Sequence, residues 1–216
     1  MNNEYNIYWE RCWKEDDVSE LYQYLNMYYG MKSKEIDIFK AHNIVNVCDA
    51  ACGFGAYSLA FASNGFHVSS FDISGTAVEI TINGLKKYGI DNVNVRVASI
   101  LDTGYAGEAF DGVIAHAVLD HLVVEDTKKA LMELLRITKT NGLILISFDI
   151  AKEDDILEDH ITLEDGTMQY TSGNRKGMLF KPYDWDKIDE LLKSYSIVYK
   201  ADKLKREKIV ILEKTG

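Results

Sequence analysis

The stretch DAACGFG, residues 49–55, decides the fold of this chain. It follows the apolar run 44–48 and precedes a helix-like stretch that starts at Ala56. A strand, a tight glycine turn and a helix, in that order, form the place where a nucleotide-like ligand meets the carboxyl end of a parallel sheet. The sequence therefore predicts an α/β protein with a ligand site at this turn.

The acid in this stretch separates it from an ordinary dinucleotide site. Asp49 closes the strand directly before the glycines, where a carboxylate would repel a pyrophosphate and suit a cationic amino group. The third glycine of the GxGxxG pattern is also missing, because Gly53 and Gly55 are followed by Ser58. A nicotinamide enzyme is therefore disfavoured. The loop fits a nucleoside that carries positive charge and no phosphates, and S-adenosylmethionine meets that description.

A second acid supports this interpretation. Residues 67–71 predict the next strand, and Asp72 ends it, 17 residues after Gly55. An acid at the end of the second strand is placed to accept hydrogen bonds from both hydroxyls of a ribose.

With these two motifs, the chain resembles the class I S-adenosylmethionine-dependent methyltransferases, in particular the small single-domain enzymes that act on metabolites. VASI at 97–100 falls where that family flanks the adenine, and AFDGVIAHAVLDHL at 109–122 resembles its motif beside the transferred methyl group. NGLILIS at 141–147 resembles the turn and fifth strand. The resemblance covers residues 43–150 and reaches the C-terminus by architecture only.

The resemblance implies S-adenosylmethionine as cofactor, S-adenosylhomocysteine as product, and a cofactor site that we expect to contain Asp49, Ala51, Gly53, Gly55, Asp72, Ile73, Ser99, Ile100 and His116. Two positions depart from the family pattern. Ala51 stands where the family usually has glycine, so we expect a negative φ there if close backbone approach survives. Ser99 stands where the family often has an acid, and a hydroxyl is a weaker acceptor for the adenine amine.

The catalytic and acceptor-side residues are less determined by the sequence. Methyl transfer from a sulfonium requires mainly alignment and exclusion of water, and a base only when the acceptor is protonated. His116, at the end of the fourth strand, is the predicted base, with a packing role as the alternative. His121 is predicted only to fix the loop that enters the helix at Val124. Trp9 and Trp13 share a helical face and form either a lid with a cation–π contribution or a hydrophobic staple. Tyr170 is a candidate substrate contact or a surface residue. No metal site is predicted.

The alternation of strands and helices predicts a Rossmann-like α/β fold with helices on both faces of a mostly parallel, seven-stranded sheet. The predicted strands are 44–48, 67–71, 93–97, 110–115 and 142–149, and the predicted helices are 56–64, 75–88, 124–139 and 184–195. The turn at 140–142 is predicted to cap the C-terminus of the helix 124–139. Strands 196–199 and 209–212 form a C-terminal hairpin, so one of them runs antiparallel to the sheet. Asp165-Gly166 predicts a further hairpin over 161–170.

We expect one domain, 1–216. Its predicted parts are an aromatic N-terminal segment (1–32), a cofactor-binding core (33–150), a substrate-side insertion (151–183), and a final helix and hairpin (184–216).

Composition narrows the class of partner. A net charge of −10 on 216 residues disfavours nonspecific electrostatic binding to nucleic acid. The basic run 200–208 fits a solvated turn better than a binding patch. No signal peptide and no apolar run near 18 residues are visible, so we expect a cytoplasmic protein without a membrane segment. Cys48 and Cys52 are expected to be reduced core thiols, with a metalloid pair as the alternative.

These observations predict methyl transfer to a small molecule by a monomer or homodimer. An RNA or protein acceptor, and a non-catalytic S-adenosylmethionine-binding protein, remain the alternatives.

Overall fold

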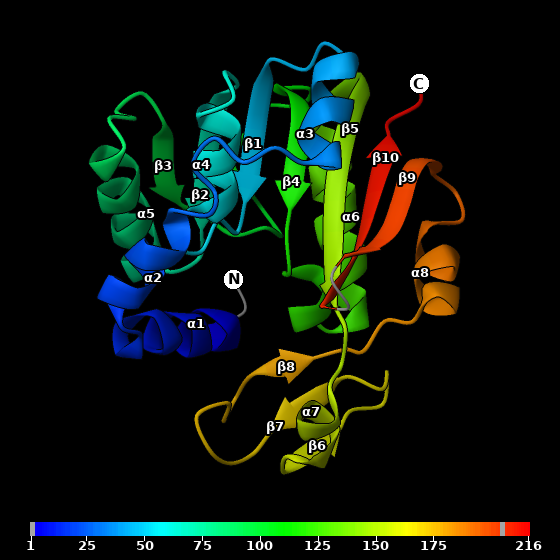
Figure 1. The fold of residues 1–216 in the computed structure, drawn as a ribbon. Helices are drawn as coiled ribbons and strands as arrows, with labels where there is room; N and C mark the ends of the chain where they lie inside the picture. Colours follow the sequence, from blue (N-terminus) through cyan, green and yellow to red (C-terminus); the bar gives the residue numbers. More distant parts are fainter. Residues whose placement is uncertain (1–2, 204–205) are drawn as a thin grey trace.

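A computed structural model describes residues 3–203 and 206–216 (Figure 1). Its main sheet has seven strands in the order β3-β2-β1-β4-β5-β10-β9. Five strands pair in parallel: β1 (Asn46–Ala50), β2 (His67–Asp72), β3 (Asn94–Val97), β4 (Phe110–Ala115) and β5 (Thr138–Asp149). β10 (Glu207–Glu213) runs antiparallel between β5 and β9 (Ser196–Lys203), so the predicted fold class is confirmed.

Helices cover both faces of this sheet, because successive strand residues point to opposite sides. Cys48 and Val113 pack with α6 (Val124–Ile137) and α8 (Trp185–Leu192). Their neighbours Val47 and Ile114 pack on the other face with α3 (Lys34–Ala41) and α4 (Ala56–Ala62). The fifth helix of the core, α5 (Gly75–Lys87), contacts β2 and β3.

Most predicted element boundaries differ from the structure by a few residues, and two of the differences concern the strands β1 and β5. β1 begins at Asn46 and includes Asp49, two residues later than predicted. The helix α6 ends at Ile137, and the predicted turn at 140–142 lies inside β5. Asn141 has a φ of 63°, and a Cβ at Gly142 would lie 2.6 Å from the carbonyl oxygen of Asp111. These two residues therefore bend the strand where the sequence pattern predicted a helix cap.

The C-terminal hairpin lies at the sheet edge as predicted. Lys200 pairs with Asp189 at 2.9 Å, and Lys203 pairs with Glu35 at 3.4 Å, so these two members of the basic run take part in structural contacts. Lys205 lies outside the described residues.

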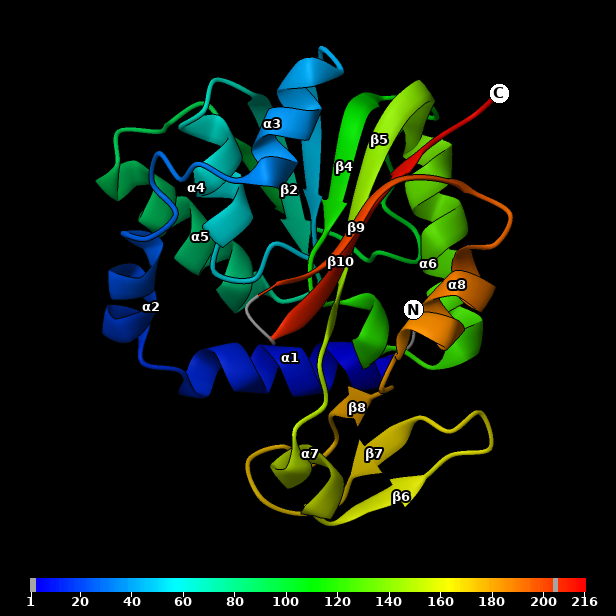
Figure 2. The same ribbon diagram turned by 45° about the vertical axis from the view of Figure 1, so that its right-hand side comes forward.

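The insertion forms a small second sheet below the carboxyl edge of the main one (Figure 2). Its strands are β6 (His160–Thr162), β7 (Met168–Tyr170) and β8 (Leu179–Phe180), and the helix α7 (Glu153–Leu157) precedes them. The predicted hairpin is confirmed, because β6 and β7 pair antiparallel and Gly166 has a φ of 79° in the turn. Asp165 fastens this turn to the start of α6 by accepting a 2.7 Å hydrogen bond from the Val124 amide.

The N-terminal helices α1 (Asn3–Glu15) and α2 (Val18–Leu25) lie outside the sheet. Both ribbon views show α1 crossing the carboxyl edge, between the main sheet and the insertion. Arg11 of α1 donates a 2.6 Å hydrogen bond to the carbonyl oxygen of Lys176 in the insertion. The helix therefore bridges the two sheets.

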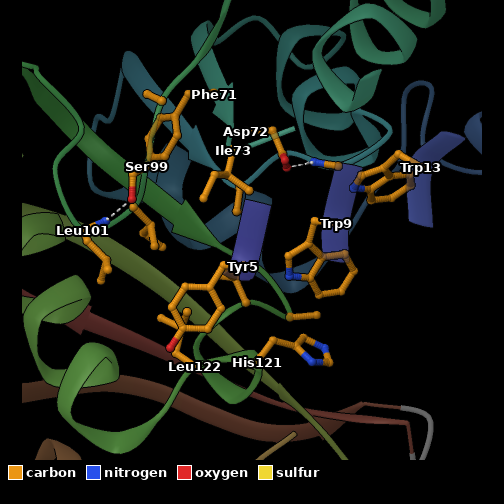
Figure 3. Close-up of a pocket in the computed structure, with 16 residues that line it drawn as sticks. Tyr5, Trp9, Trp13, Phe71, Asp72, Ile73, Ser99, Leu101, His121 and Leu122 are labelled. Carbon is orange, nitrogen blue, oxygen red and sulfur yellow. Dashed lines mark hydrogen bonds between the residues drawn. The ribbon is translucent and has the colours of Figure 1, made fainter. Parts of the chain in front are cut away.

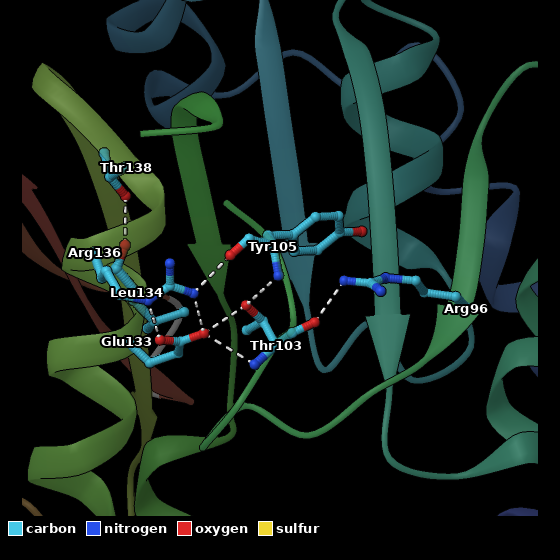
Figure 4. Close-up of polar contacts among 7 residues, drawn as sticks. All are labelled: Arg96, Thr103, Tyr105, Glu133, Leu134, Arg136 and Thr138. Carbon is cyan, nitrogen blue, oxygen red and sulfur yellow. Dashed lines mark hydrogen bonds and ion pairs between the residues drawn. The ribbon is translucent and has the colours of Figure 1, made fainter. Parts of the chain in front are cut away.

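A polar network holds the loop after β3 against α6 (Figure 4). Glu133 accepts hydrogen bonds from the Thr103 amide (2.9 Å), the Thr103 hydroxyl (2.6 Å) and Arg136 (2.6 Å). Arg136 in turn donates to the carbonyl oxygen of Tyr105 at 2.8 Å. The network fixes the loop that carries Ser99. Within residues 3–203 and 206–216, none of the helices is long and apolar enough to cross a membrane.

Candidate functional site

A cavity opens at the carboxyl ends of β1, β2 and β4, underneath α1 (Figure 3). It is lined by Tyr5, Trp9, Trp13, Ala51, Gly53, Phe71, Asp72, Ile73, Ala98, Ser99, Ile100, Leu101, Ala117, Val118, His121 and Leu122. The sheet order reverses between β1 and β4, so the cavity lies at the topological switch point where open α/β sheets bind ligands.

The glycine loop forms one wall of the cavity. Gly53 has a φ of 54°, its amide donates a 2.9 Å hydrogen bond to Asp72, and its carbonyl accepts one from the Thr81 hydroxyl at 2.7 Å. Gly55 is the residue that precedes α4, and it does not itself line the cavity. Ala51 has a φ of 58°, so the predicted negative φ is wrong, and the family's glycine is replaced here by a residue in the left-handed region.

Asp72 lies on the cavity wall, at the end of β2. Its two oxygens accept 2.9 Å hydrogen bonds from the amides of Gly53 and Ser74. Burial nevertheless raises the pKa of Asp72 to about 6. The carboxylate is thus fixed in place by backbone donors, and its remaining lone pairs are available to hydroxyl donors of a ligand.

Asp49 is buried beneath the glycine loop and does not line the cavity directly. The Ser58 hydroxyl donates a 2.6 Å hydrogen bond to it. Burial raises the pKa of Asp49 to about 6, and the Ser58 hydrogen bond partly opposes this. Contact between Asp49 and a ligand's amino group stays a prediction.

The part of the cavity that was predicted to hold the adenine is mostly apolar. Ile73, Ser99 and Ile100 all line the cavity, and Ala98 joins them. The Ser99 hydroxyl oxygen accepts a 3.1 Å hydrogen bond from the Leu101 amide, which orients the side chain (Figure 3).

Aromatic side chains of α1 cover the cavity. Trp9 and Trp13 share one face of the helix, with ring centroids 6.5 Å apart, and both line the cavity. Tyr5 anchors the start of the helix by donating a 3.1 Å hydrogen bond to Asp126 of α6. The tryptophans thus lie over the ligand space, as the lid interpretation requires.

His116 does not line the cavity. Its Nε2 lies 2.5 Å from a carboxylate oxygen of Glu207, and its ring packs on Tyr57 with centroids 4.4 Å apart. The strand turns sharply after it, since Ala117 has a φ of 47°, and Ala117 is the residue that reaches the cavity. This placement favours the packing alternative for His116 over the predicted base.

His121 is the histidine that reaches the cavity. It ends the short 3₁₀ turn η1 (Leu119–His121), and its ring stands edge-on to Trp9 with centroids 5.1 Å apart. Its Nδ1 lies 2.9 Å from the carbonyl oxygen of Leu179. Sequence reasoning assigned this histidine to loop packing. Its position inside the fourth-strand motif, 109–122, was the available signal.

A second cavity adjoins the first and shares Trp9 and His121 with it. Its walls come from α1, from the end of β5 and from the insertion, and its other lining residues are Tyr8, Cys12, Asp149, Ile150, Lys152, Asp155, Arg175, Met178, Phe180 and Arg206. Tyr170 is not among them. It is buried in the core of the insertion, where its hydroxyl donates a 2.8 Å hydrogen bond to the Asp155 carbonyl oxygen.

The cysteines near the cofactor loop are buried and free. Burial raises the pKa of both Cys48 and Cys52 well above its usual range, so both remain protonated thiols. This favours core packing over a metalloid pair.

The family model of a methyltransferase domain matches residues 41–196. A protein of Pyrococcus horikoshii has a similar structure, with a TM-score of 0.70, 19% identity, and coverage of 91% of this chain and 99% of that one. The 1,6-didemethyltoxoflavin-N1-methyltransferase of Burkholderia thailandensis, solved with S-adenosylhomocysteine, has a TM-score of 0.64 and 16% identity, and the match covers 84% of this chain and 76% of that one. At these identities the likeness shows the fold alone.

Curated relatives match shorter stretches. An uncharacterized protein of Haemophilus influenzae is 33% identical over 46% of this chain and 40% of its own length. The EEF1A lysine methyltransferase 2 of Danio rerio is 26% identical over 70% of this chain and 71% of its own. The tRNA (carboxymethyluridine(34)-5-O)-methyltransferase of Arabidopsis thaliana is 34% identical over 50% of this chain and 25% of its own. The chain thus spans less than half of the first and the third relative.

The match over well more than half of the chain assigns it to the methyltransferase domain family. With its sheet order it belongs to the class I S-adenosylmethionine-dependent methyltransferases, a class whose cofactor is S-adenosylmethionine.

Proposed function

We propose that this methyltransferase transfers the methyl group of S-adenosylmethionine to a small molecule bound in the second cavity. The observation that carries the proposal is that this cavity meets the cofactor cavity at Trp9 and His121. An acceptor enclosed between α1 and the insertion would therefore lie next to the reactive end of the cofactor. Methyl transfer from a sulfonium depends mainly on holding the two reactants close together and aligned.

We assign the cofactor contacts as follows. Asp49 would attract the amino group of the methionine part, and the backbone of Ala51, Gly53 and Gly55 would lie beneath that part. Asp72 would accept hydrogen bonds from the ribose hydroxyls, in the position where Gly53 and Ser74 hold its carboxylate.

The adenine would lie among Ile73, Ser99 and Ile100. These side chains offer an apolar surface and one hydroxyl oriented by the Leu101 amide.

In the reaction, a nucleophilic atom of the acceptor attacks the methyl carbon as the carbon–sulfur bond breaks. The electron pair of that bond stays on sulfur and yields neutral S-adenosylhomocysteine. Trp9 and Trp13 would exclude water and favour the sulfonium charge through their ring faces. We propose His121, in place of His116, as the histidine nearest the acceptor, because His121 lines both cavities.

Charge favours a small acceptor over RNA. The chain carries a net charge of −10, and Arg175 in the second cavity is already paired with Asp155 at 2.6 Å. An RNA-binding surface needs unpaired cations along the phosphate backbone. The relatives act on a protein and on tRNA by name, so both acceptor classes belong in the test.

Calorimetric titration with S-adenosylmethionine, S-adenosylhomocysteine and NAD tests the cofactor site. Saturable binding of the first two, with NAD inert, is expected. A transfer assay with radiolabelled methyl groups then compares metabolite extracts, tRNA and protein lysates as acceptors. Label in a metabolite fraction supports the proposal, whereas label only in tRNA or protein overturns the acceptor class. Cofactor binding with no transfer to any fraction favours the non-catalytic alternative.

A further inference from the structure

Three potential ligand side chains meet where the two cavities join. Asp120 and His121 end the η1 turn after β4, and Asp149 ends the neighbouring strand β5. One carboxylate oxygen from each acid and one ring nitrogen of His121 all lie within 4.8 Å of one another. Parallel neighbouring strands bring these chain segments together, because their carboxyl ends share one edge of the sheet.

The hydrogen bonds of Asp120 leave one of its oxygens unused. Asp120 is fully buried, and its Oδ2 accepts a 2.7 Å hydrogen bond from the Asp149 amide. Its Oδ1 is buried and has no hydrogen-bond partner in residues 3–203 and 206–216. Within those same residues, no lysine or arginine forms an ion pair with either acid. A buried carboxylate without a counter-charge is costly, so this oxygen points to a missing cation.

The hydrogen bond of His121 leaves one of its ring nitrogens free to bind a metal ion. A carbonyl oxygen can only accept a hydrogen bond, so the 2.9 Å contact with Leu179 places a proton on Nδ1 of His121. The neutral ring then carries its lone pair on Nε2. Metal-binding histidines commonly donate their other ring nitrogen to a backbone carbonyl in this way.

We propose that Asp120, His121 and Asp149 bind a divalent first-row transition ion. Two carboxylates and one imidazole suit such an ion better than Mg²⁺ or Ca²⁺, which prefer oxygen ligands throughout. Three protein ligands leave further coordination positions open, as at catalytic metal centres. His121 and Asp149 both line the second cavity, so those positions face the proposed acceptor space. The sequence predicted no metal because the three residues lie on two distant segments.

This inference rests on the proposed function for its chemical role. The ion would lower the pKa of a hydroxyl group on the acceptor, so that this hydroxyl would lose its proton to solvent water and its oxygen would attack the methyl carbon. The new oxygen–carbon bond forms as the carbon–sulfur bond breaks, and sulfur keeps the electron pair. The ion would thus select acceptors that carry a hydroxyl group.

A shared proton between the two acids is the competing explanation. Burial, and then the neighbouring Asp120, raises the pKa of Asp149. Two buried carboxylates this close to each other repel when both are charged, which favours a shared proton or a bound cation. The two explanations differ in whether added metal binds.

The test uses the full-length protein, freed of metal with a chelator and titrated with Mn²⁺ by electron paramagnetic resonance. Zn²⁺ is then added to displace the bound Mn²⁺. We expect saturable binding of one ion per chain, with the affinity reduced about tenfold or more in Asp149→Asn. Asp186→Asn, an exposed change on α8, is the matched control and should bind like the unmodified protein.

S-adenosylhomocysteine affinity is measured on the same samples. Absent Mn²⁺ binding in a protein that still binds S-adenosylhomocysteine overturns the metal site alone and supports the shared proton. Unchanged metal affinity in Asp149→Asn also overturns it. A protein that fails to bind S-adenosylhomocysteine, with metal bound normally, instead contradicts the proposed function.

Discussion

The carboxylate of Glu10 on α1 accepts a 2.6 Å hydrogen bond from the hydroxyl of Ser74, two residues beyond Asp72. The same carboxylate accepts a 2.8 Å hydrogen bond from the Thr76 hydroxyl and a 3.2 Å bond from the Thr76 amide. Ser74 is also the residue that caps α5. The aromatic helix over the cofactor cavity is thus fastened to the loop that holds the predicted ribose acid.

Replacement of Glu10 by glutamine should weaken the hydrogen bonds that hold α1 to the loop after β2. The hydrogen bond from Ser74 is the main cause that lowers the pKa of Glu10, to about 2, so the charged form makes the contact. These contacts stabilise the position of α1 over the cavity by about 1 kcal/mol. Their loss should raise the dissociation rate of S-adenosylhomocysteine about fivefold in stopped-flow measurements. The contact contributes fully above the unfolded pKa near 4.3 and is lost as pH falls towards 2. The exposed change Glu15→Gln should leave the rate unaltered, and equal rates in both variants would contradict the lid role.

Replacement of Asp72 by alanine should weaken cofactor binding. Two charge-assisted hydrogen bonds to the ribose are lost, which costs about 2 kcal/mol or more, or about 30-fold in affinity by calorimetry. Unchanged affinity in a folded variant would remove the ribose assignment.

The affinity should also depend on pH through Asp72. Because burial raises its pKa to about 6, Asp72 is protonated at lower pH and must release that proton to accept the ribose hydroxyls. The dissociation constant should therefore rise about tenfold between pH 7 and pH 5. In the ligand-free protein, the free energy of unfolding depends on pH in the opposite direction. The contribution of Asp72 to it is fully present below the unfolded pKa near 3.9 and is lost as pH rises through about 6. Asp72→Asn should flatten the pH dependence of binding, and an equally steep profile in that variant would assign the effect to another group.

Replacement of Ala51 by glycine should stabilise the protein. Ala51 has a φ of 58°, a conformation that costs an L-residue about 1 kcal/mol and glycine much less. Scanning calorimetry should therefore show a rise in Tm of about 2–4 °C. The control Ala56→Gly lies in the first turn of α4 and should lower Tm, because glycine disfavours a helix. A fall in Tm for Ala51→Gly would show that the methyl group contributes packing that outweighs the backbone strain.

Gly55 and Gly65 form a matched pair that separates backbone strain from crowding. Both have a positive φ, 86° and 92°. A Cβ at Gly55 would lie 2.8 Å from a methyl carbon of Thr81, whereas a Cβ at Gly65 has nothing within 4 Å. Gly65→Ala should therefore cost about 1 kcal/mol in chemical denaturation, and Gly55→Ala about 1–3 kcal/mol more. Equal costs would mean that Thr81 moves aside without loss.

The local patterns were sufficient for most elements of the main sheet. β4 has the predicted bounds, 110–115, and its mostly buried residues on both faces are typical of a central strand. The turn at 140–142 was misjudged, since asparagine followed by glycine suits both a helix cap and a bend inside a strand. The crowding of Gly142 against Asp111 settles the choice, and a local pattern does not contain that contact.

What the sequence determined by itself is the class of fold and the place of a cavity at the carboxyl ends of the strands. Gly53 and Asp72 line this cavity, and local spacing was enough to place them there because both adjoin the strands that position them. The histidine facing the cavity was decided only by the tertiary structure. His116 is held by Glu207, 91 residues away, and His121 by Leu179, 58 residues away. Side-chain direction at a strand end depends on such distant partners, and the pairing of Asp120 with Asp149 depends in the same way on the order of the strands.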